Sequence, residues 1–279
     1  MCATCGCGDD GATITVMSAR AKSRPDLPGH SHPHDHTHPH DHDHDHDHDH
    51  PDGHVHTETI SLEQKVLAKN DLLAEQNRTW LAEHNILALN MTSSPGAGKT
   101  TLLERTIRDL ASDRPVVVIE GDQETLLDAE RIKAAGARAV QVNTGAGCHL
   151  DADMVRRALE ALDPEPGSIL FIENVGNLVC PALFDLGEHS KVVVISVTEG
   201  EDKPLKYPHM FAAAGLVIVN KIDLLPYVDF DLETCCAYVR SVNPGADILP
   251  TSATTGDGSA RWYEWIDVHA NSAYVPKTH

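Results

Sequence analysis

The chain has 279 residues, a formal net charge of −20 at pH 7, and 41% hydrophobic residues. This length allows one or two domains, and the acidic balance argues against a nucleic acid partner. No stretch approaches the ~20 consecutive apolar residues that a membrane-spanning helix needs, and the N-terminus lacks the apolar core of a signal peptide. We therefore expect a soluble, cytoplasmic protein with no nucleic acid and no membrane partner.

The N-terminus is rich in cysteine. Cys2, Cys5 and Cys7 form a C-x-x-C-x-C pattern beside the α-amino group of Met1. The total of seven cysteines is odd, which fits a reducing compartment better than a disulfide framework. Three thiolates and an amine could form a tight site, and Ni²⁺ accepts square-planar geometry. A redox or incidental role is the alternative, but the position of the pattern in a His-rich segment favours metal binding.

Histidine dominates the segment that follows. Thirteen of the 27 residues from His30 to His56 are histidine, and they alternate with aspartate from Asp41 to His50. Neutral imidazole binds nickel, copper and zinc, and a flexible row of imidazoles offers many interchangeable sites. An expression tag or a solvated low-complexity run is the alternative, but the aspartate alternation is not that of a six-histidine tag. We predict that residues 1–57 form a disordered metal-binding tail that stores nickel.

The composition changes at Thr59, where the folded part is expected to begin. Ser61 and Gln64 have the spacing of a capping box, so we predict a leading helix over residues 58–84. Beyond it, helical stretches alternate with short apolar runs, which lie at 86–91, 116–120, 139–142, 169–173, 192–197, 216–220 and 248–253. Continuous apolar runs of this length are typical of strands buried on both faces. We therefore predict an α/β domain over residues 85–279, with a mostly parallel β-sheet flanked by helices and ligands beyond the carboxyl ends of its strands.

The first apolar run is followed by a phosphate-binding motif. The sequence SSPGAGKT matches the P-loop pattern G-x-x-x-x-G-K-[ST], except that Ser93 stands in the place of the first glycine. In such a loop the backbone N–H groups surround phosphate, Lys99 would reach the β- and γ-phosphates, and the Thr100 hydroxyl would bind Mg²⁺. The motif predicts a P-loop NTPase fold; the alternative is a Gly-rich turn that holds no ligand. The expected nucleotide-binding residues are Ser94, Pro95, Gly96, Ala97, Gly98, Lys99, Thr100 and Thr101.

A second motif predicts which base is bound. Asn220, Lys221 and Asp223 form an N-K-x-D sequence at the end of an apolar run. The Asp223 carboxylate can accept from both N1–H and the exocyclic amine of guanine, whereas adenine would leave it unpaired. Asn220 can bind the other edge of the base, and Lys221 can lie along its ring. Ser252 and Ala253 could offer a backbone N–H to the guanine oxygen. Alone, N-K-x-D could be an ordinary charged turn, but together with a P-loop it favours GTP over ATP.

A third motif predicts a switch. The sequence E-N-V-G from Glu173 to Gly176 resembles the D-x-x-G switch of GTPases with Glu in place of Asp. Glu173 could bind Mg²⁺ and Gly176 could place its N–H on the γ-phosphate, so the following segment would respond to hydrolysis. Glu120 and Asp122 end another strand and could hold Mg²⁺ or the attacking water, although strand ends often carry solvated acids. No water-orienting Gln or arginine finger stands beside Glu173, which predicts slow intrinsic hydrolysis. The predicted catalytic residues are Lys99, Thr100, Asp122 and Glu173.

Three further residues are candidate metal ligands. Cys148 and His149 follow an apolar run, and Cys180 lies four residues after the switch-like sequence. Two thiolates and an imidazole at the nucleotide edge of the sheet suit Ni²⁺ or Zn²⁺, but three ligands leave the coordination shell incomplete. A second copy of the chain could complete it across a two-fold axis. The alternative is that the two cysteines are small buried hydrophobes. We assign Cys235 and Cys236 to core packing.

These strings together resemble the HypB family of hydrogenase nickel incorporation proteins. The resemblance covers the whole chain and rests on the C-x-x-C-x-C start, the His tract, SSPGAGKT, GAGCHLDADM, FIENVGNLVCP, EGEDKPLKYP and NKID. It implies a GTPase that uses GTP, GDP, Mg²⁺ and Ni²⁺ and helps insert nickel into the large subunit precursor of nickel-iron hydrogenase. It also implies a GTP-dependent homodimer, a HypA-type accessory partner, and a metal site at Cys148, His149 and Cys180 near the dimer interface.

Three other functions compete with this one. A urease-type nickel accessory GTPase shares the fold. Such proteins are expected to carry a Cys-Pro-His sequence, whereas here Cys148 is followed directly by His149. A zinc-directed metallochaperone GTPase would carry its Cys-rich motif near the switch strand. The non-enzyme alternative is a nickel storage protein with an inactive G domain, which measurement of GTP turnover would distinguish.

Overall fold

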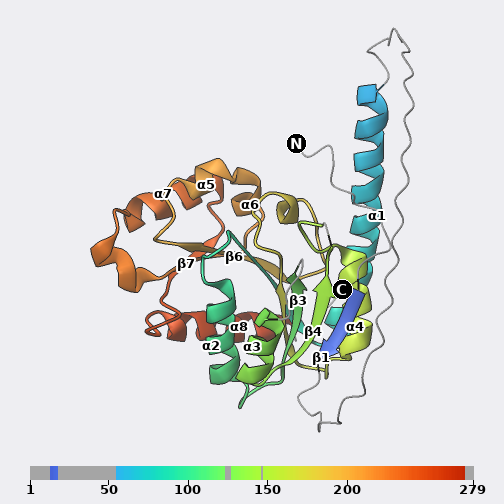
Figure 1. The fold of residues 1–279 in the computed structure, drawn as a ribbon, viewed down its shortest axis with the longest axis horizontal. Coiled ribbons are helices and arrows are strands. Elements are labelled where there is room, and N and C mark those ends of the chain that lie inside the picture. The colour runs from blue at the N-terminus through green and yellow to red at the C-terminus, as the bar shows by residue number, and fades with distance from the viewer. Residues whose placement is uncertain (1–12, 18–54, 123–126, 146, 274–279) are drawn as a thin grey trace, which may run out of the picture.

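The computed structural model describes residues 13–17, 55–122, 127–145 and 147–273, and its centre is a mostly parallel sheet (Figure 1). Within these ranges the sheet has eight strands in the order β1-β4-β3-β5-β2-β6-β7-β8. β1 pairs with β4 antiparallel, and the other neighbouring pairs are parallel. The strands are β1 (Thr13–Met17), β2 (Leu87–Ser93), β3 (Val116–Asp122), β4 (Arg138–Asn143), β5 (Ile169–Glu173), β6 (Ser190–Ser196), β7 (Leu216–Asn220) and β8 (Asp247–Pro250). The predicted sheet is confirmed.

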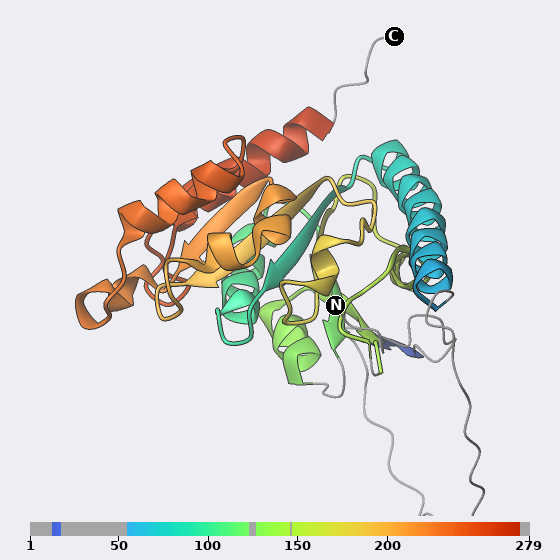
Figure 2. The same cartoon turned by 90° about the horizontal axis from the view of Figure 1, so that it is seen from above.

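Helices cover both faces of the sheet (Figures 1 and 2). They are α1 (Val55–Glu83), α2 (Lys99–Leu110), α3 (Leu127–Ala135), α4 (Ala152–Leu162), α5 (Lys203–Lys206), α6 (Pro208–Ala212), α7 (Leu232–Val242) and α8 (Ser259–Ala273), with short 3-10 helices η1 (Cys180–Ala182) and η2 (Ile222–Tyr227). One hydrophobic core joins α2, α3 and α8 to one face. On the other face, α1 and α4 pack on β3, β4 and β5, and α6 and α7 pack on β6 and β7. Every long strand is therefore buried on both sides, which explains its continuous apolar sequence.

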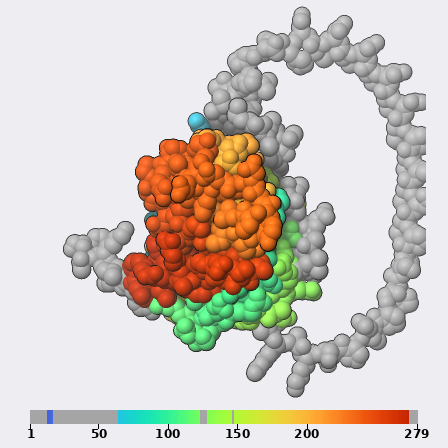
Figure 3. All heavy atoms as spheres, turned by 90° about the vertical axis from the view of Figure 1, so that its left-hand side faces the viewer, coloured from blue at the N-terminus to red at the C-terminus, as the bar shows by residue number. Residues whose placement is uncertain are grey.

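Buried side chains, and a hydrogen bond between two helices, fix the position of the helices on the sheet. In α2, Leu102, Leu103 and Ile107 are almost fully buried against the sheet. Trp262 of α8 is fully buried, and its indole Nε1 donates to Thr106 Oγ1 at 2.9 Å, which ties α8 to α2. The surface at the β8 end of the sheet is formed largely by the last third of the chain, coloured orange to red in Figure 3. The loops that follow the central strands begin at the carboxyl ends of those strands, so they lie together at one edge of the sheet.

The predicted leading helix is present as α1, which begins at Val55. Its inner face carries Asn77, which is 2% exposed and donates to the carbonyl oxygens of Ala152 and Leu186 at 2.9 and 3.0 Å. Asn70 donates to the Asp185 carbonyl oxygen at 2.8 Å. Because buried amides of this kind need partners, α1 is fixed to the start of α4 and to the segment after η1. None of the described helices is long and apolar enough to cross a membrane.

The strand β1 lies within the segment predicted as a tail, where the sequence analysis expected no strand. Its residues pair with β4 from Thr13 opposite Asn143 to Met17 opposite Ala139. The short β-branched sequence TITVM has little to mark it, since an edge strand of this length depends on the neighbour that it pairs with. The predicted ligands Cys2, Cys5 and Cys7 and the His tract up to His54 lie outside the described residues, so their metal binding stays a prediction.

Candidate nucleotide and metal site

The P-loop connects β2 to α2 with a tight glycine turn. Gly96 and Gly98 have φ values of +77° and +92°, in the left-handed region that glycine adopts readily. A Cβ at Gly98 would lie 2.5 Å from the Asn220 side-chain nitrogen, so a larger residue does not fit. The turn is closed by the Ala97 N–H, which donates to the Ser94 carbonyl oxygen at 3.3 Å. The segment therefore has the close backbone turn before a helix N-terminus that phosphate binding requires.

The N-K-x-D residues brace this turn. Asn220 Nδ2 donates to the Ala97 carbonyl oxygen at 2.9 Å, and Lys221 Nζ donates to that of Gly96 at 2.7 Å. The Asn220 side chain is 1% exposed, so these bonds join the end of β7 rigidly to the loop after β2. The predicted base-binding and phosphate-binding motifs are thus one connected structure.

The loop after β8 closes the base side of the site. Asp223 Oδ1 accepts from the Ser252 hydroxyl at 2.6 Å, which orients the carboxylate. The Ala253 N–H donates to Asn220 Oδ1 at 3.0 Å, and the Ser252 N–H donates to the Asp257 carbonyl oxygen at 2.9 Å. A guanine oxygen would therefore share an N–H that is already bonded inside the protein. The structure brings the predicted residues together, and guanine binding by them stays a prediction.

Glu173 holds both predicted catalytic residues of the P-loop. Its Oε1 lies 3.0 Å from Lys99 Nζ and accepts from the Thr100 hydroxyl at 2.6 Å. The Lys99 ammonium also donates to the Asn174 carbonyl oxygen at 2.7 Å. Glu173 Oε2 is buried and has no hydrogen-bond partner. The switch-like sequence therefore touches the P-loop directly, as its resemblance to D-x-x-G implies.

The remaining predicted nucleotide residues lie around this centre. Gly176 packs beside the P-loop, where a Cβ at Gly176 would lie 3.5 Å from Pro95 Cγ. The Thr101 hydroxyl accepts from the Arg131 guanidinium at 3.2 Å. Asp122 ends β3, and its carbonyl oxygen accepts from the Thr144 N–H at 3.0 Å. Asp122 thus stands at the same edge of the sheet.

Glu120 adds a further buried carboxylate beside this centre. Its side chain is 2% exposed, and its Oε2 is buried without a hydrogen-bond partner. Burial, together with the charges of Glu173, Asp122 and Asp128, raises the pKa of Glu120 to about 8, against a smaller lowering by Lys99. Orphaned carboxylate oxygens of this kind fit a hard divalent cation, because Mg²⁺ takes oxygen ligands and offsets their charge.

The raised pKa of Glu120 predicts a pH-dependent stability. A folded-state pKa of about 8 against an ordinary 4.5 means that folding favours the protonated acid, so this stabilisation is complete below pH 4.5 and is lost as pH rises toward 8. At about 1.4 kcal/mol per pKa unit, the loss amounts to about 2–5 kcal/mol. In Mg²⁺-free buffer, we expect Glu120→Gln to unfold with a larger free energy than the unchanged chain at pH 8.

Urea denaturation of both chains between pH 4.5 and pH 8.5 would measure this effect. The difference between the two should shrink toward zero at pH 4.5. Glu130→Gln, which changes an exposed glutamate of α3, is the control and should leave the pH dependence as it is. Parallel stability curves for the unchanged chain and Glu120→Gln would contradict the assignment.

Cys148, His149 and Cys180 form a compact group at the same edge of the sheet. Their ligand atoms all lie within 4.8 Å of one another, and Cys148 Sγ is 3.7 Å from His149 Nδ1. Metal bonds of roughly 2.0–2.3 Å in a tetrahedral site place their donors about 3.5 Å apart. A small inward shift would therefore let three donors reach one ion. Both cysteines are half-buried, so the group is accessible from outside.

The protonation state of His149 suits metal binding. Burial lowers the pKa of its imidazole, and the nearby Asp151 carboxylate offsets part of this effect. The neutral ring is the form that binds metal. The ring packs against Phe184 in a tilted arrangement with their centroids 3.9 Å apart, and Asn177 Nδ2 donates to the Cys148 carbonyl oxygen at 3.3 Å. Asn177 and Phe184, which lie on either side of Cys180 in the sequence, thus hold the Cys148–His149 segment in place.

The other two described cysteines belong to the core. Cys235 is fully buried, and burial raises its pKa to about 12. Cys236 is also buried, and burial raises its pKa as well. Such thiols are neutral and unreactive. The prediction that these two residues serve core packing is confirmed.

The structure adds site residues that the sequence analysis missed. Asp128 Oδ2 lies 3.4 Å from the Thr100 hydroxyl, and Lys203 Nζ donates to the Ser94 hydroxyl at 3.0 Å. Asn174 contacts Lys99 through its carbonyl oxygen. Asp128 and Lys203 lie in helices and match no nucleotide motif. The one sequence signal for Lys203 is its place in the string EGEDKPLKYP.

Comparisons with known proteins show the family that this chain is similar to. Residues 87–250 match the family model of the CobW/HypB/UreG nucleotide-binding domain. The hydrogenase maturation factor HypB of Rhizobium leguminosarum bv. viciae is 60% identical over 211 residues, which cover 76% of this chain and 71% of that protein.

Two solved structures share the fold and much of the sequence. The hydrogenase maturation factor HypB of Archaeoglobus fulgidus superposes with a TM-score of 0.68 at 39% identity, covering 73% of this chain and 99% of that one. HypB of Helicobacter pylori, solved in complex with nickel, gives a TM-score of 0.69 at 35% identity, covering 76% and 99% of the two chains. The match to the nucleotide-binding domain, over residues 87–250, runs from β2 to β8.

Proposed function

Since this chain belongs to the HypB family of hydrogenase maturation factors, we propose that it is a GTP-hydrolysing metallochaperone that helps insert nickel into the large subunit precursor of nickel-iron hydrogenase. One observation carries the proposal: the group formed by Cys148, His149 and Cys180 lies at the same sheet edge as the P-loop and N-K-x-D residues. A HypA-type accessory protein and a second copy of the chain are the expected partners. The tail would store nickel for the site.

In the proposed GTP site each residue has a physical task. Lys99 lies where its charge can stabilise the β- and γ-phosphates, and Asp223 accepts from the guanine ring. Thr100 and Glu173, with Glu120 or Asp122 beside them, offer the oxygen ligands that Mg²⁺ needs. When bound, Mg²⁺ supplies positive charge that offsets the charge developing on the phosphates. Glu173 contacts both Lys99 and Thr100, so nucleotide binding must rearrange these contacts.

Nickel is the proposed cargo of the thiolate and imidazole donors. Ni²⁺ and Zn²⁺ both accept such ligands, and three donors leave at least one coordination position for a ligand from outside the chain. A second copy in a GTP-dependent homodimer or a partner protein could provide that ligand. An incomplete shell also suits a site that must release its metal.

The metal site predicts a loss of nickel binding on removal of one thiol. We expect Cys148→Ser or Cys180→Ser to weaken binding at this site by at least about tenfold, since even residues that only support metal ligands cost this much when changed. Titration of Ni²⁺ into full-length protein with Cys2, Cys5 and Cys7 changed to serine would measure it, with thiolate-to-nickel charge-transfer absorbance as the readout, because nickel on the histidines of residues 30–56 gives no such band. Cys236→Ser in the same background is the control. Equal affinity in all these variants would refute the assignment.

We expect the tail to serve nickel storage and the folded domain to serve GTP hydrolysis. Deletion of residues 30–56 should lower the number of nickel ions bound per chain because it removes thirteen histidines, while GTP turnover should change less than about twofold. Nickel stoichiometry and phosphate release measured on the same preparations would test both parts. A large loss of turnover would show that the tail also serves the GTPase domain.

A further inference from the structure

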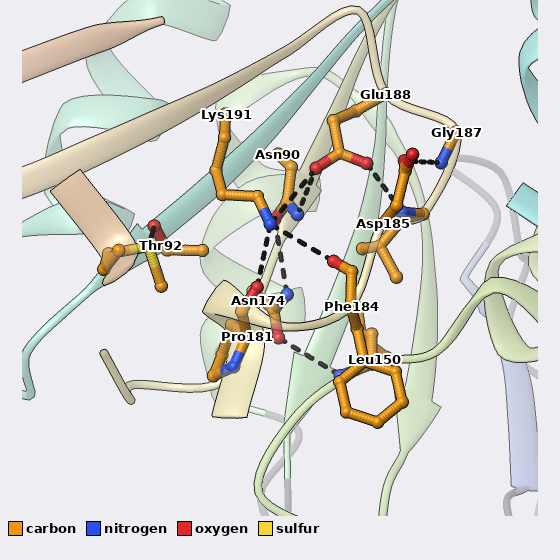
Figure 4. Close-up of polar contacts among 12 residues, drawn as sticks. Asn90, Thr92, Leu150, Asn174, Pro181, Phe184, Asp185, Gly187, Glu188 and Lys191 are labelled. Atoms are coloured by element: carbon orange, nitrogen blue, oxygen red, sulfur yellow. Dashed lines mark hydrogen bonds and ion pairs between the residues drawn. The ribbon is translucent and has the colours of Figure 1, made fainter. Parts of the chain in front are cut away.

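Four buried polar residues form a continuous network (Figure 4). Hydrogen bonds link one end of the network to the P-loop and the other to the segment of the candidate metal ligands. We call this group the Asn90–Lys191 network; its members are Asn90, Asn174, Glu188 and Lys191. Each of them is at most 7% exposed. They come from β2, from the switch-like sequence, and from β6 and the loop before it. None of them belongs to a recognised nucleotide or metal motif except Asn174, which stands between Glu173 and Gly176.

The nucleotide end of the network is Asn174. Its carbonyl oxygen accepts from Lys99 Nζ at 2.7 Å, so its backbone contacts the residue that would bind phosphate. Its side-chain Oδ1 accepts from the Leu150 N–H at 3.2 Å, one residue beyond His149. Its Nδ2 donates to Asn90 Oδ1 at 3.3 Å. One buried residue therefore contacts the P-loop lysine, the Cys148–His149 segment and the rest of the network.

The metal end of the network is Lys191. Asn90 Nδ2 donates to Glu188 Oε1 at 3.0 Å, and Lys191 Nζ lies 3.6 Å from the same oxygen. Lys191 Nζ then donates to the carbonyl oxygens of Pro181 and Phe184 at 2.8 and 3.1 Å. Pro181 follows Cys180 directly, and the Phe184 ring packs against the His149 ring. A single ammonium group thus fixes the backbone that carries Cys180 and supports His149.

The energetics favour a positioning role for this ion pair. Moving two charges out of water costs several kcal/mol per ion, and well-packed apolar residues often stabilise a core as well or better. Fully bonded buried polar groups do, however, specify one arrangement of the backbone around them. Here that backbone is the segment from Cys180 to Phe184, whose carbonyl oxygens at Pro181 and Phe184 accept from Lys191.

We propose that the Asn90–Lys191 network couples the two sites, with Lys191 as the positioning residue of the candidate metal site. When phosphate draws the Lys99 ammonium away from the Asn174 carbonyl, the Asn174 side chain shifts its bonds to Leu150 and Asn90. The shift passes through Glu188 to Lys191 and changes the separation of Cys148, His149 and Cys180. The inference rests on the proposed function, and it adds the residues through which nucleotide state sets nickel affinity.

The test is the ratio of nickel dissociation constants with GDP and with a non-hydrolysable GTP analogue. The full chain carries Cys2, Cys5 and Cys7 as serine, so that thiolate-to-nickel charge-transfer absorbance reports on Cys148 and Cys180. We expect a ratio of about 5–150 with Lys191 present, in the usual range of coupling between sites. Lys191→Met, which keeps an unbranched side chain but removes the ammonium group, should bring the ratio to within about twofold of one. A purely structural role would weaken binding in both nucleotide states and leave the ratio unchanged.

Controls separate this inference from the proposed function. Lys69→Met changes an exposed lysine of α1 and should keep the ratio. The double variant Lys191→Met/Glu188→Gln leaves no unpaired buried charge, so it tests the network if the single variant does not fold. A preserved ratio in a folded Lys191 variant overturns the network and leaves the proposed function standing. A ratio of one in the background protein also overturns the network, and an absence of charge-transfer absorbance in it overturns the proposed metal site as well.

Discussion

Lys99→Ala should reduce GTP turnover by at least about 10²-fold, in line with the loss of one charged or hydrogen-bonding group that stabilises a transition state. Lys99 is the P-loop cation, and phosphoryl transfer depends almost entirely on positioning and charge stabilisation. Its removal also leaves Glu173, whose side chain is 3% exposed, without its ion-pair partner. Single-turnover phosphate release, measured at saturating GTP, separates the chemical step from nucleotide affinity.

The control for this prediction is Lys69→Ala, which removes an exposed lysine of α1 and should leave turnover unchanged. Circular dichroism and thermal unfolding would show whether Lys99→Ala keeps its fold. Turnover equal to that of the unchanged chain would remove Lys99 from the mechanism. Absence of turnover in the unchanged chain itself would instead favour a nickel storage protein with an inactive G domain.

Short contiguous motifs account for what the sequence predicted well. A P-loop needs its glycines, lysine and hydroxyl residue within one turn, so eight consecutive residues are enough to identify it. The buried strands were equally easy to predict from the sequence, because a strand covered on both faces is apolar along its length. Asn220 and Lys221 are near the P-loop because the carboxyl ends of parallel strands meet at one edge.

The residues that escaped prediction depend on contacts between distant segments. Asn90 lies inside an apolar strand, and only its bonds to Glu188 and Asn174 show why an amide is there. Lys191 looks like an ordinary charged residue before a strand, yet it is buried and bonded to two carbonyl groups. No local pattern marks such residues, since their partners are set by how β2, β5 and β6 align in the sheet. The strand β1 was missed for a similar reason, because pairing with β4 defines it.

The candidate metal ligands fall between these two cases. Cys148 and His149 are adjacent in sequence, but Cys180 joins them only because the loops after β4 and β5 fold to the same edge. From the sequence alone, both cysteines could equally be small buried hydrophobic residues. The structure places them half-exposed and close to a neutral imidazole, an arrangement that core packing does not require.

Asp223→Asn should lower GTP affinity by at least about 10²-fold, because a site built to pair with a polar group rejects a partner that leaves it unpaired. The variant keeps the shape of the side chain, and its oxygen can still accept from the Ser252 hydroxyl that now contacts Asp223 at 2.6 Å. Its amide nitrogen, however, would face the two N–H donors of guanine. Xanthosine triphosphate carries an oxygen in place of the exocyclic amine, so its affinity should rise.

Fluorescence titration with GTP, xanthosine triphosphate and ATP would measure the change in base preference. Asp229→Asn, an exposed aspartate close by in the chain, is the control and should keep the preference for GTP. Because the variant exchanges an acceptor for a donor, the preference should invert toward xanthine. A uniform loss of affinity for all three nucleotides would mean that Asp223 supports the loop through Ser252 and does not read the base.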